Sequence, residues 1–192
     1  DPWVAAAASG AFVVVWADWR DTIGSPVLGR LYAADRTPSR GHLEMDPQVY
    51  PRQREARIAM DPSGHFVVVW KQDFLYGRRF APDGSPLGAA FAVENHQDAP
   101  RRHSVAMLAD GGFVVAWSEY TAGMLEVWAR VFAPGGQPRG SEFVVKTLNN
   151  DYLSDQRTAA AGEPGGGFVL SWSSTRGDSY PSGVEARRFD AA

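Results

Sequence analysis

Hydrophobic residues in this chain gather in short runs separated by turn-forming residues, and four of these runs are nearly the same. They read "SGAFVVVW", "SGHFVVVW", "DGGFVVAW" and "GGGFVLSW" and end at Trp16, Trp70, Trp117 and Trp172. Another apolar segment lies upstream of each glycine turn, so the pattern predicts a β-hairpin repeated four times. No stretch has a convincing 3.6-residue period, and we expect almost no helix.

A third apolar segment follows each tryptophan, with an arginine two residues before an aromatic residue. These segments are 27–32, 75–80, 127–132 and 184–189. In the first three units a turn and a fourth short segment follow, at 42–45, 90–93 and 142–145. Four short strands in a unit of about 40–50 residues are typical of a β-propeller blade. A β-sandwich also uses many short strands, but the regular period favours the propeller.

The sequence therefore predicts an all-β fold, a β-propeller in a single domain, 1–192, with four blades of four antiparallel strands each. The blades are approximately 1–49, 50–99, 100–156 and 157–192, and the last blade lacks its fourth strand. Both sides of the second strand are apolar, since Phe66, Val68 and Trp70 alternate with Val67 and Val69. A sheet covered on both faces requires this pattern. Three outcomes stay open for the incomplete blade: a three-stranded blade in a closed ring, a part of a larger ring, or a dimer.

The repeated segments also carry a family resemblance. The stretches "VAMLADGGFVVAW", "VEARRFD", "APDGSPLG", "SEFVV" and "QDAP" resemble a tandem repeat of many large secreted or surface proteins of bacteria. The resemblance covers nearly the whole chain and implies a propeller-like array in an extracellular or cell-surface protein. It implies no catalytic residues. The first unit departs most, because "AADRTPSRG" lacks the Asp-Gly turn and Gly29 replaces alanine in the third segment.

Composition and charge limit the kinds of site and partner that we expect. The 192 residues carry a formal net charge of −3 and no cysteine, so disulfides and thiolate chemistry are excluded. A mildly acidic chain does not favour nucleic acid as a partner, and we expect no membrane insertion because no 20-residue apolar span is present. The histidines, His42, His65, His96 and His103, have no ligand spacing, so we expect no metal and no cofactor.

The sequence predicts a binding site in the connections that differ most between the repeat units. The segments that follow the second and fourth strands share one side of a propeller and differ strongly between units, whereas the turns on the other side are short and alike. Function tends to be carried by such variable loops. The candidate ligand-binding residues are Trp19, Arg20, Tyr50, Phe74, Tyr120, Tyr152, Arg176, Asp178 and Tyr180. Exposed aromatic rings with polar neighbours suit glycan or protein partners, although the rings could instead pack against their own loops.

Three clusters have a structural as well as a functional interpretation. The arginines before the aromatic residues, Arg30, Arg78, Arg130 and Arg187, could bind anions, but stacking on rings and pairing with a carboxylate between blades fits them better. Basic residues at 52, 54, 57 and 101–103 could form a patch for an anionic glycan or be solvated surface charge. "TRGDS" at 175–179 resembles a cell-adhesion tripeptide.

These observations predict an extracellular binding or adhesion module that contacts glycan or protein. The alternative is a structural assembly module that packs with copies of itself as a homo-oligomer or with other subunits. A glycan-cleaving enzyme is the third possibility, and the turn motif of sialidase propellers is absent. We therefore expect no catalytic residues.

Overall fold

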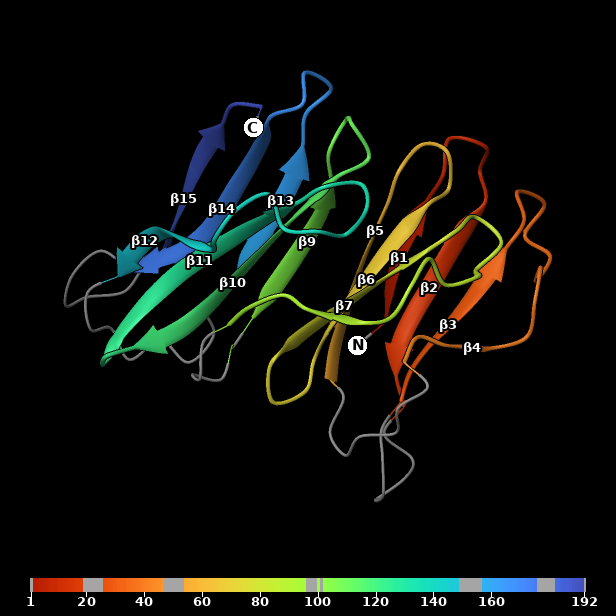
Figure 1. The fold of residues 1–192 in the computed structure, drawn as a ribbon, viewed down its shortest axis with the longest axis horizontal. Coiled ribbons are helices and arrows are strands. Elements are labelled where there is room, and N and C mark those ends of the chain that lie inside the picture. Colours follow the sequence, from red (N-terminus) through yellow and green to blue (C-terminus); the bar gives the residue numbers. More distant parts are fainter. Residues whose placement is uncertain are drawn as a thin grey trace. The chain divides into compact units, whose positions relative to one another are not determined.

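The computed structural model describes residues 2–18, 26–46, 54–95, 100, 102–148, 157–175 and 182–191, and all regular structure among them is β-strand. The strands form antiparallel sheets of four, four, four and three strands in chain order (Figure 1). This confirms the predicted fold class, an all-β propeller fold of four blades. The last blade has three described strands, and β15 is at the edge of its sheet.

Strand order follows the chain in every sheet, so each connection within a sheet joins neighbouring strands. The first sheet contains β1 (Trp3–Ala6), β2 (Phe12–Ala17), β3 (Val27–Tyr32) and β4 (Leu43–Glu44). The second contains β5 (Arg54–Met60), β6 (Phe66–Lys71), β7 (Leu75–Phe80) and β8 (Phe91–Ala92). The third contains β9 (His103–Met107), β10 (Phe113–Thr121), β11 (Met124–Phe132) and β12 (Phe143–Leu148). The fourth contains β13 (Thr158–Gly162), β14 (Phe168–Thr175) and β15 (Ser182–Phe189).

The first two strands of every sheet are joined by a tight turn at the glycine of the repeat. Gly10, Gly64, Gly111 and Gly166 have φ angles of 88°, 95°, 83° and 90°. This left-handed conformation costs glycine little, because it has no Cβ to clash. In each turn the glycine N–H donates a 3.0 Å hydrogen bond to the carbonyl three residues earlier. The repeated glycine is therefore a requirement of backbone geometry.

A second repeated device lies beside this turn. The phenylalanine that opens the second strand stacks on the aromatic residue that ends the third, in the pairs Phe12–Tyr32, Phe66–Phe80, Phe113–Phe132 and Phe168–Phe189. Members of each pair are direct cross-strand partners. The ring centroids are 4.7, 4.9, 4.8 and 4.7 Å apart, within the range of favourable stacking. The repeat therefore encodes four copies of one aromatic clamp.

The chain forms two compact units, Asp1–Asn95 and His96–Ala192, of two sheets each. We call the side of a sheet that carries the phenylalanine and tryptophan of the second strand its front face, and the opposite side its back face. In the first unit, Phe66, Val68 and Trp70 on the front face of the second sheet form one core with Val13 and Val15 on the back face of the first. β5 lies against β1 and β2 in this arrangement.

The second unit repeats this packing. Phe168, Leu170 and Trp172, on the front face of the fourth sheet, share a core with Val114 and Ala116 on the back face of the third. β13 lies against β9 and β10, as β5 does against β1 and β2 in the first unit. Sheets within a unit therefore pack front face to back face, which buries the apolar residues that period-2 alternation places on both sides of a strand.

The four tryptophans occupy equivalent register positions, as predicted. They lie opposite Leu28, Tyr76, Trp128 and Glu185 on the third strands. Trp70, Trp117 and Trp172 are buried, whereas Trp16 is only half-buried. The predicted repeat is therefore confirmed in the register of the four tryptophans, and the first sheet differs in how far its ring is covered.

Candidate functional site

Each sheet has two edges with different chemistry. The loop edge is where second and fourth strands end, and the turn edge is where the glycine turns lie. Most of the residues predicted to bind ligand belong to connections at the loop edge. Seven of them lie outside the described residues: Trp19, Arg20, Tyr50, Tyr152, Arg176, Asp178 and Tyr180. Their role stays a prediction.

The two described candidates are Phe74 and Tyr120. Phe74 is half-buried in the turn between β6 and β7, where its carbonyl accepts a 2.9 Å hydrogen bond from Gln72 N–H. Tyr120 lies in β10, and its half-buried ring packs against the apolar core of the second unit. Tyr120 is thus part of the packing of its own unit, the alternative that the sequence left open for each ring.

The connections after the second strand are short in the second and third blades, and in the third blade the strands run further than predicted. Gln72–Phe74 connects β6 and β7 as a tight turn, and β10 and β11 continue to a two-residue turn at Ala122 and Gly123. Both turn residues have positive φ, 50° and 83°, which is the geometry of a type I′ hairpin. Sequence reasoning missed this because "SEYTAGML" contains hydrophilic residues that belong to extended strands.

The extended β10–β11 hairpin brings two carboxylates together at the loop edge. Glu119 and Glu126 are direct cross-strand partners, and side chains opposite each other on one face have Cβ atoms about 4.5–5.5 Å apart. Glu119 is fully buried and Glu126 is half-buried. The signal was present in the sequence, since a two-residue Ala-Gly turn would have placed these positions opposite each other.

Hydrogen bonds hold this carboxylate pair from both sides. The indole N–H of Trp117 donates to Oε2 of Glu119 at 3.0 Å, and Thr121 Oγ1 lies 3.5 Å from the other carboxylate oxygen. The hydroxyl of Thr147, in β12, donates to Oε1 of Glu126 at 3.0 Å. An ionised carboxylate has about four lone-pair sites, so Glu126 retains capacity to accept hydrogen bonds from a ligand.

Acidic residues also lie at the loop edge of the first unit, but one of them has a structural task. Glu94, which follows β8, is almost fully buried, and its Oε1 accepts a 3.0 Å hydrogen bond from Leu75 N–H at the start of β7. Asp46 takes the equivalent place after β4 and is also buried. Glu94 thus satisfies a backbone donor at a strand end, as buried polar groups must.

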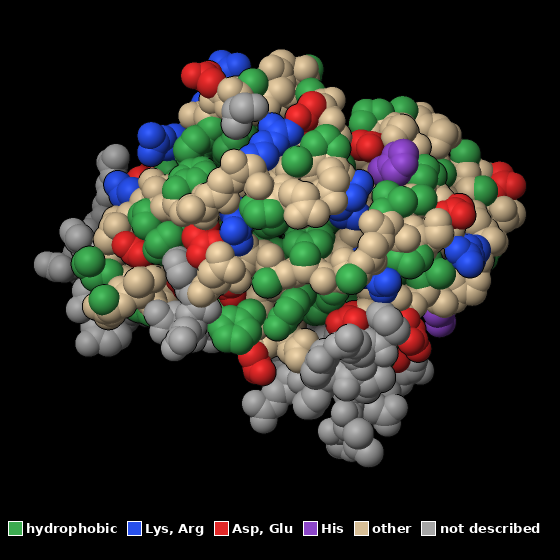
Figure 2. Space-filling model, in the orientation of Figure 1, with side chains coloured by type: hydrophobic (Ala, Val, Ile, Leu, Met, Phe, Trp, Pro, Cys, Tyr) green, Lys and Arg blue, Asp and Glu red, His purple; other side chains and the backbone are tan. Residues whose placement is uncertain are grey.

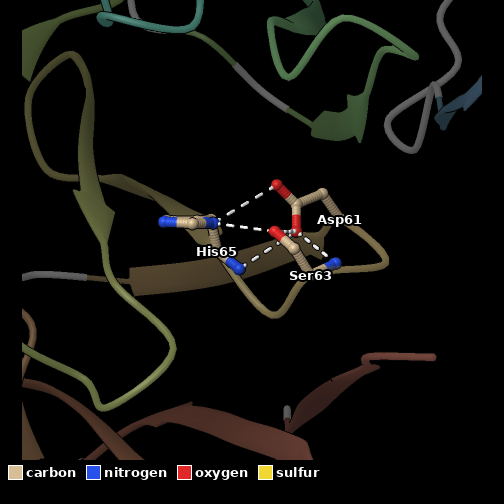
Figure 3. A network of polar contacts seen from close by, with 3 residues as sticks. All are labelled: Asp61, Ser63 and His65. Atoms are coloured by element: carbon tan, nitrogen blue, oxygen red, sulfur yellow. Dashed lines mark hydrogen bonds and ion pairs between the residues drawn. The ribbon is translucent and has the colours of Figure 1, made fainter. Parts of the chain in front are cut away.

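The turn edge carries a polar network that resembles a catalytic triad in composition only (Figure 3). Asp61 Oδ1 accepts hydrogen bonds from the N–H groups of Ser63 and His65, at 2.8 and 3.1 Å, and from Ser63 Oγ at 2.6 Å. Ser63 Oγ is 2.8 Å and Asp61 Oδ2 is 3.7 Å from the same ring nitrogen, Nδ1 of His65. A triad needs the serine and the carboxylate on opposite ring nitrogens, and here both lie at the same nitrogen. The network therefore stabilises the turn that contains it.

The same device recurs in other turns. Asp35 accepts from the N–H and hydroxyl of Thr37, and Asp83 accepts from those of Ser85. The hydroxyl contact, followed by the backbone contact, holds the pKa of both carboxyls below the ordinary value of 3.8. The N–H of Gly112 is the largest cause that lowers the pKa of Asp110. Aspartates at the turn edge therefore accept hydrogen bonds from the backbone of their own turns and stabilise them.

The repeated arginines also have structural partners. Arg30, Arg78, Arg130 and Arg187 lie over the second ring of each aromatic clamp, 5.7, 5.8, 5.8 and 5.1 Å from its centroid. This confirms the stacking interpretation. Arg130 also pairs at 3.2 Å with Glu142, which directly precedes β12 of the same sheet, and Arg78 donates to the carbonyls of Gly88 and Met45. At these two positions the structure shows a carboxylate of the same blade and main-chain carbonyls where the sequence predicted a carboxylate between blades.

Two residues of the predicted basic patch have other surroundings in the described part of the chain. His103 is buried, and Arg57 lies over the ring of Trp3 at 4.3 Å; Arg52 and Arg101 are outside the described residues. Basic and acidic side chains are interspersed on the face shown in Figure 2. Among the described residues no group of three or more His, Asp or Glu side chains could hold a metal ion, and no helix could span a membrane.

One hollow at the turn edge of the first unit has a volume of about 80 Å³ and is bounded by Phe12, Tyr32, Ser63 and Pro82 among others. Ligand pockets for small molecules are generally several times larger, about 300–1,000 Å³. This hollow is therefore a packing gap between two turns. The loop edge, with the Glu119–Glu126 pair, is the better candidate for a functional surface.

Comparison with solved structures supports the fold. A protein of unknown function from Dyadobacter fermentans aligns with 95% of this chain at 14% identity and a TM-score of 0.64, over 51% of its own length. An α-L-arabinofuranosidase from Podospora anserina, solved with cellotriose, aligns with 100% of this chain at 13% identity and a TM-score of 0.56, over 64% of its length. An endo-arabinase from Bacteroides thetaiotaomicron aligns with 96% of this chain at 12% identity and a TM-score of 0.50, over 72% of its length.

These likenesses show a shared propeller fold, because at such identities a fold carries no assignment of function. The chain spans 51% and 64% of the length of the first two proteins. No protein-family model matches the sequence, and no curated protein matches it.

Proposed function

We propose that this chain is a carbohydrate-binding module of a secreted or cell-surface protein and that it contacts glycan with the loop edge of its sheets. The observation that carries the proposal is the Glu119–Glu126 pair at the end of the β10–β11 hairpin. Adjacent carboxylates repel each other across a strand pair, and they are relieved by hydrogen-bond donors. The hydroxyl groups of a sugar supply such donors in a fixed geometry.

The position of this pair suits recognition. Glu126 is half-buried and is oriented by Thr147, so it is available to a ligand and is held in place. Sites built on strands are more precise than sites on loops. The connections predicted to bind, with their aromatic residues, belong to this same edge, and rings are the usual platform for the apolar face of a sugar.

Binding fits the described geometry better than cleavage. A glycosidase places two carboxyl groups on either side of a scissile bond in a cleft, whereas Glu119 is fully buried and lies beside Glu126 on one face of one hairpin. The names of two proteins of similar fold, an α-L-arabinofuranosidase and an endo-arabinase, guide the choice of test ligands. We propose that this chain binds such glycans without cleaving them.

The test is retardation of the protein in native gels that contain arabinan, followed by calorimetric titration of arabinan oligosaccharides and of cellotriose. Glu126→Gln keeps the shape of the side chain and removes its charge. Because a hydrogen bond to a charged group contributes about 1.5–3 kcal/mol, we expect affinity to fall by about tenfold or more. Thr147→Val, which removes the hydroxyl that orients Glu126, should weaken binding in the same direction.

Gly135→Ser is the matched control, because Gly135 is exposed at the turn edge of the same sheet and a Cβ there meets no other atom within 4 Å. It should bind as the parent protein does. The proposal fails if none of these glycans retards the protein, or if Glu126→Gln binds as tightly as the parent. Release of reducing sugar during the titration would instead establish a glycan-cleaving enzyme.

A further inference from the structure

The front face of the first sheet and the back face of the fourth sheet are exposed, although the equivalent faces of other sheets are buried. Within each unit, the front face of the following sheet covers the back face of the preceding one. The back face of the second sheet and the front face of the third sheet are also buried, at Val67, Val69, Phe113 and Trp117, whereas the front face of the first sheet and the back face of the fourth sheet are not. Their exposure can be compared position by position, because the register of the four sheets is the same.

The back face of the fourth sheet is exposed to solvent at a position that is buried in other sheets. Val184 follows the register of Val27 and Val127, since each lies opposite the residue after the repeated tryptophan. Val27 is 0% exposed and Val127 is 1% exposed, whereas Val184 is 79% exposed. A valine in that position is therefore a core residue wherever a neighbouring sheet covers it.

The front face of the first sheet is bare in the same way. Val4 lies opposite Val14 as Ile58 lies opposite Val68, but Val4 is 62% exposed and Ile58 is 7% exposed. Trp16 on this face is half-buried, whereas Trp70 at the same register position is fully buried. This face thus has the residues of a blade interface without the covering sheet.

The two bare faces match each other chemically. The back face of the fourth sheet repeats much of that of the third: Val169, Ala161, Ala186 and Val184 stand where Val114, Ala106, Ala129 and Val127 stand. Two positions are more polar, because Arg188 and Ser171 replace Val131 and Ala116. That third-sheet surface is covered by a front face with phenylalanine and tryptophan. The front face of the first sheet offers the same types in Phe12, Val14 and Trp16. Large side chains would again meet small ones, as dense packing requires.

We propose that the front face of the first sheet binds the back face of the fourth sheet of a second copy of this chain. The contact would continue the front-to-back packing of sheets that each unit already contains. Such a contact is head-to-tail, because two different surfaces meet, and head-to-tail contacts close into a ring when the rotation permits. Two copies that each use both faces form a dimer with two identical interfaces. This proposal is independent of glycan binding.

The test measures mass in solution by sedimentation velocity and light scattering over a range of protein concentrations. We expect the parent chain to have twice the mass of one 20.9 kDa chain. Val184→Glu and Val4→Glu each place a charge in one of the two faces, and both positions are exposed within the chain, so the fold tolerates them. At low concentration, each variant should have the mass of a single chain. Met124→Glu, at the exposed tip of the β10–β11 hairpin, is the control and should keep the parent mass.

Mixing the two variants tests the head-to-tail geometry. Val184→Glu retains its front face and Val4→Glu retains its back face, so the mixture should recover dimers that neither variant forms alone at the same concentration. Circular dichroism and thermal unfolding check that both variants remain folded. A parent chain that stays monomeric at all concentrations overturns the proposal. A dimer that both substitutions leave intact overturns it as well.

Discussion

The indole N–H of Trp117 donates a 3.0 Å hydrogen bond to Oε2 of Glu119, and both side chains are fully buried. The two residues are two positions apart in β10, so they lie on the same face of the sheet. In the fourth sheet the equivalent Trp172 is also buried, and its Nε1 has no hydrogen-bond partner among the described residues. Equivalent tryptophans of the repeat, Trp117 and Trp172, therefore have different hydrogen-bonding environments.

This difference predicts unequal effects of one substitution. Trp117→Phe and Trp172→Phe remove the same atoms from equivalent positions, but only the first deprives a buried carboxylate of a donor. An unsatisfied buried group costs about 1–3 kcal/mol, so Trp117→Phe should lower the free energy of unfolding by that much more than Trp172→Phe. Urea unfolding of both variants measures the difference. Equal losses would show that the Trp117–Glu119 hydrogen bond contributes nothing to stability.

The repeated arginines should also differ from one another. Arg130 is buried and pairs with the half-buried Glu142, whose side chain is 9% exposed, so Arg130→Met removes the cation of a largely desolvated ion pair, which costs about 3–5 kcal/mol. Arg187 is exposed at the equivalent position over Phe189. Arg187→Met should cost no more than about 1 kcal/mol, the contribution of an exposed cation–π contact. Thermal and urea unfolding give both values, and a large effect at Arg187 would contradict this ranking.

The turn between β10 and β11 offers a stabilising substitution. Ala122 has a φ of 50°, a left-handed conformation that costs a residue with a Cβ about 1–2 kcal/mol and that asparagine adopts more readily. Ala122→Asn creates the Asn-Gly pair preferred in two-residue hairpins, and we expect a higher melting temperature. Gly123→Ala, at a φ of 83°, should lower it. The type I′ assignment is wrong if the two changes have the same sign.

Acid should weaken the turns held by aspartate. The hydroxyl of Ser85 is the largest cause of the lowered pKa of Asp83, followed by the N–H of the same residue. A carboxyl whose pKa is lower in the folded state stabilises the fold above its ordinary value of 3.8, and that contribution is lost as pH falls through the folded pKa. Ser85→Ala should move the pKa of Asp83 upward, toward the ordinary value. Titration of the carboxyl resonance by NMR measures it, and an unchanged pKa would rule out the hydroxyl as the cause.

The sequence determined the repeated elements of this protein. Period-2 alternation, the glycine turn and the phenylalanine–tryptophan spacing are local features, so they predicted the hairpins, the third strands at 27–32 and 75–80 with their observed bounds, and the missing last strand. The stacking of Arg130 on Phe132 was also predictable, because residues two apart in a strand lie on one face.

Only the tertiary structure decided which equivalent residues are buried and which carboxylates meet. Val127 and Val184 have the same local sequence role, yet one is covered by a neighbouring sheet and the other is exposed, and burial depends on packing that no local pattern contains. Glu119 and Glu126 become partners only because the strands continue to Ala122 and Gly123, and alanine is a weak signal for a turn with positive φ. Strand pairing, and not composition, therefore created the candidate site.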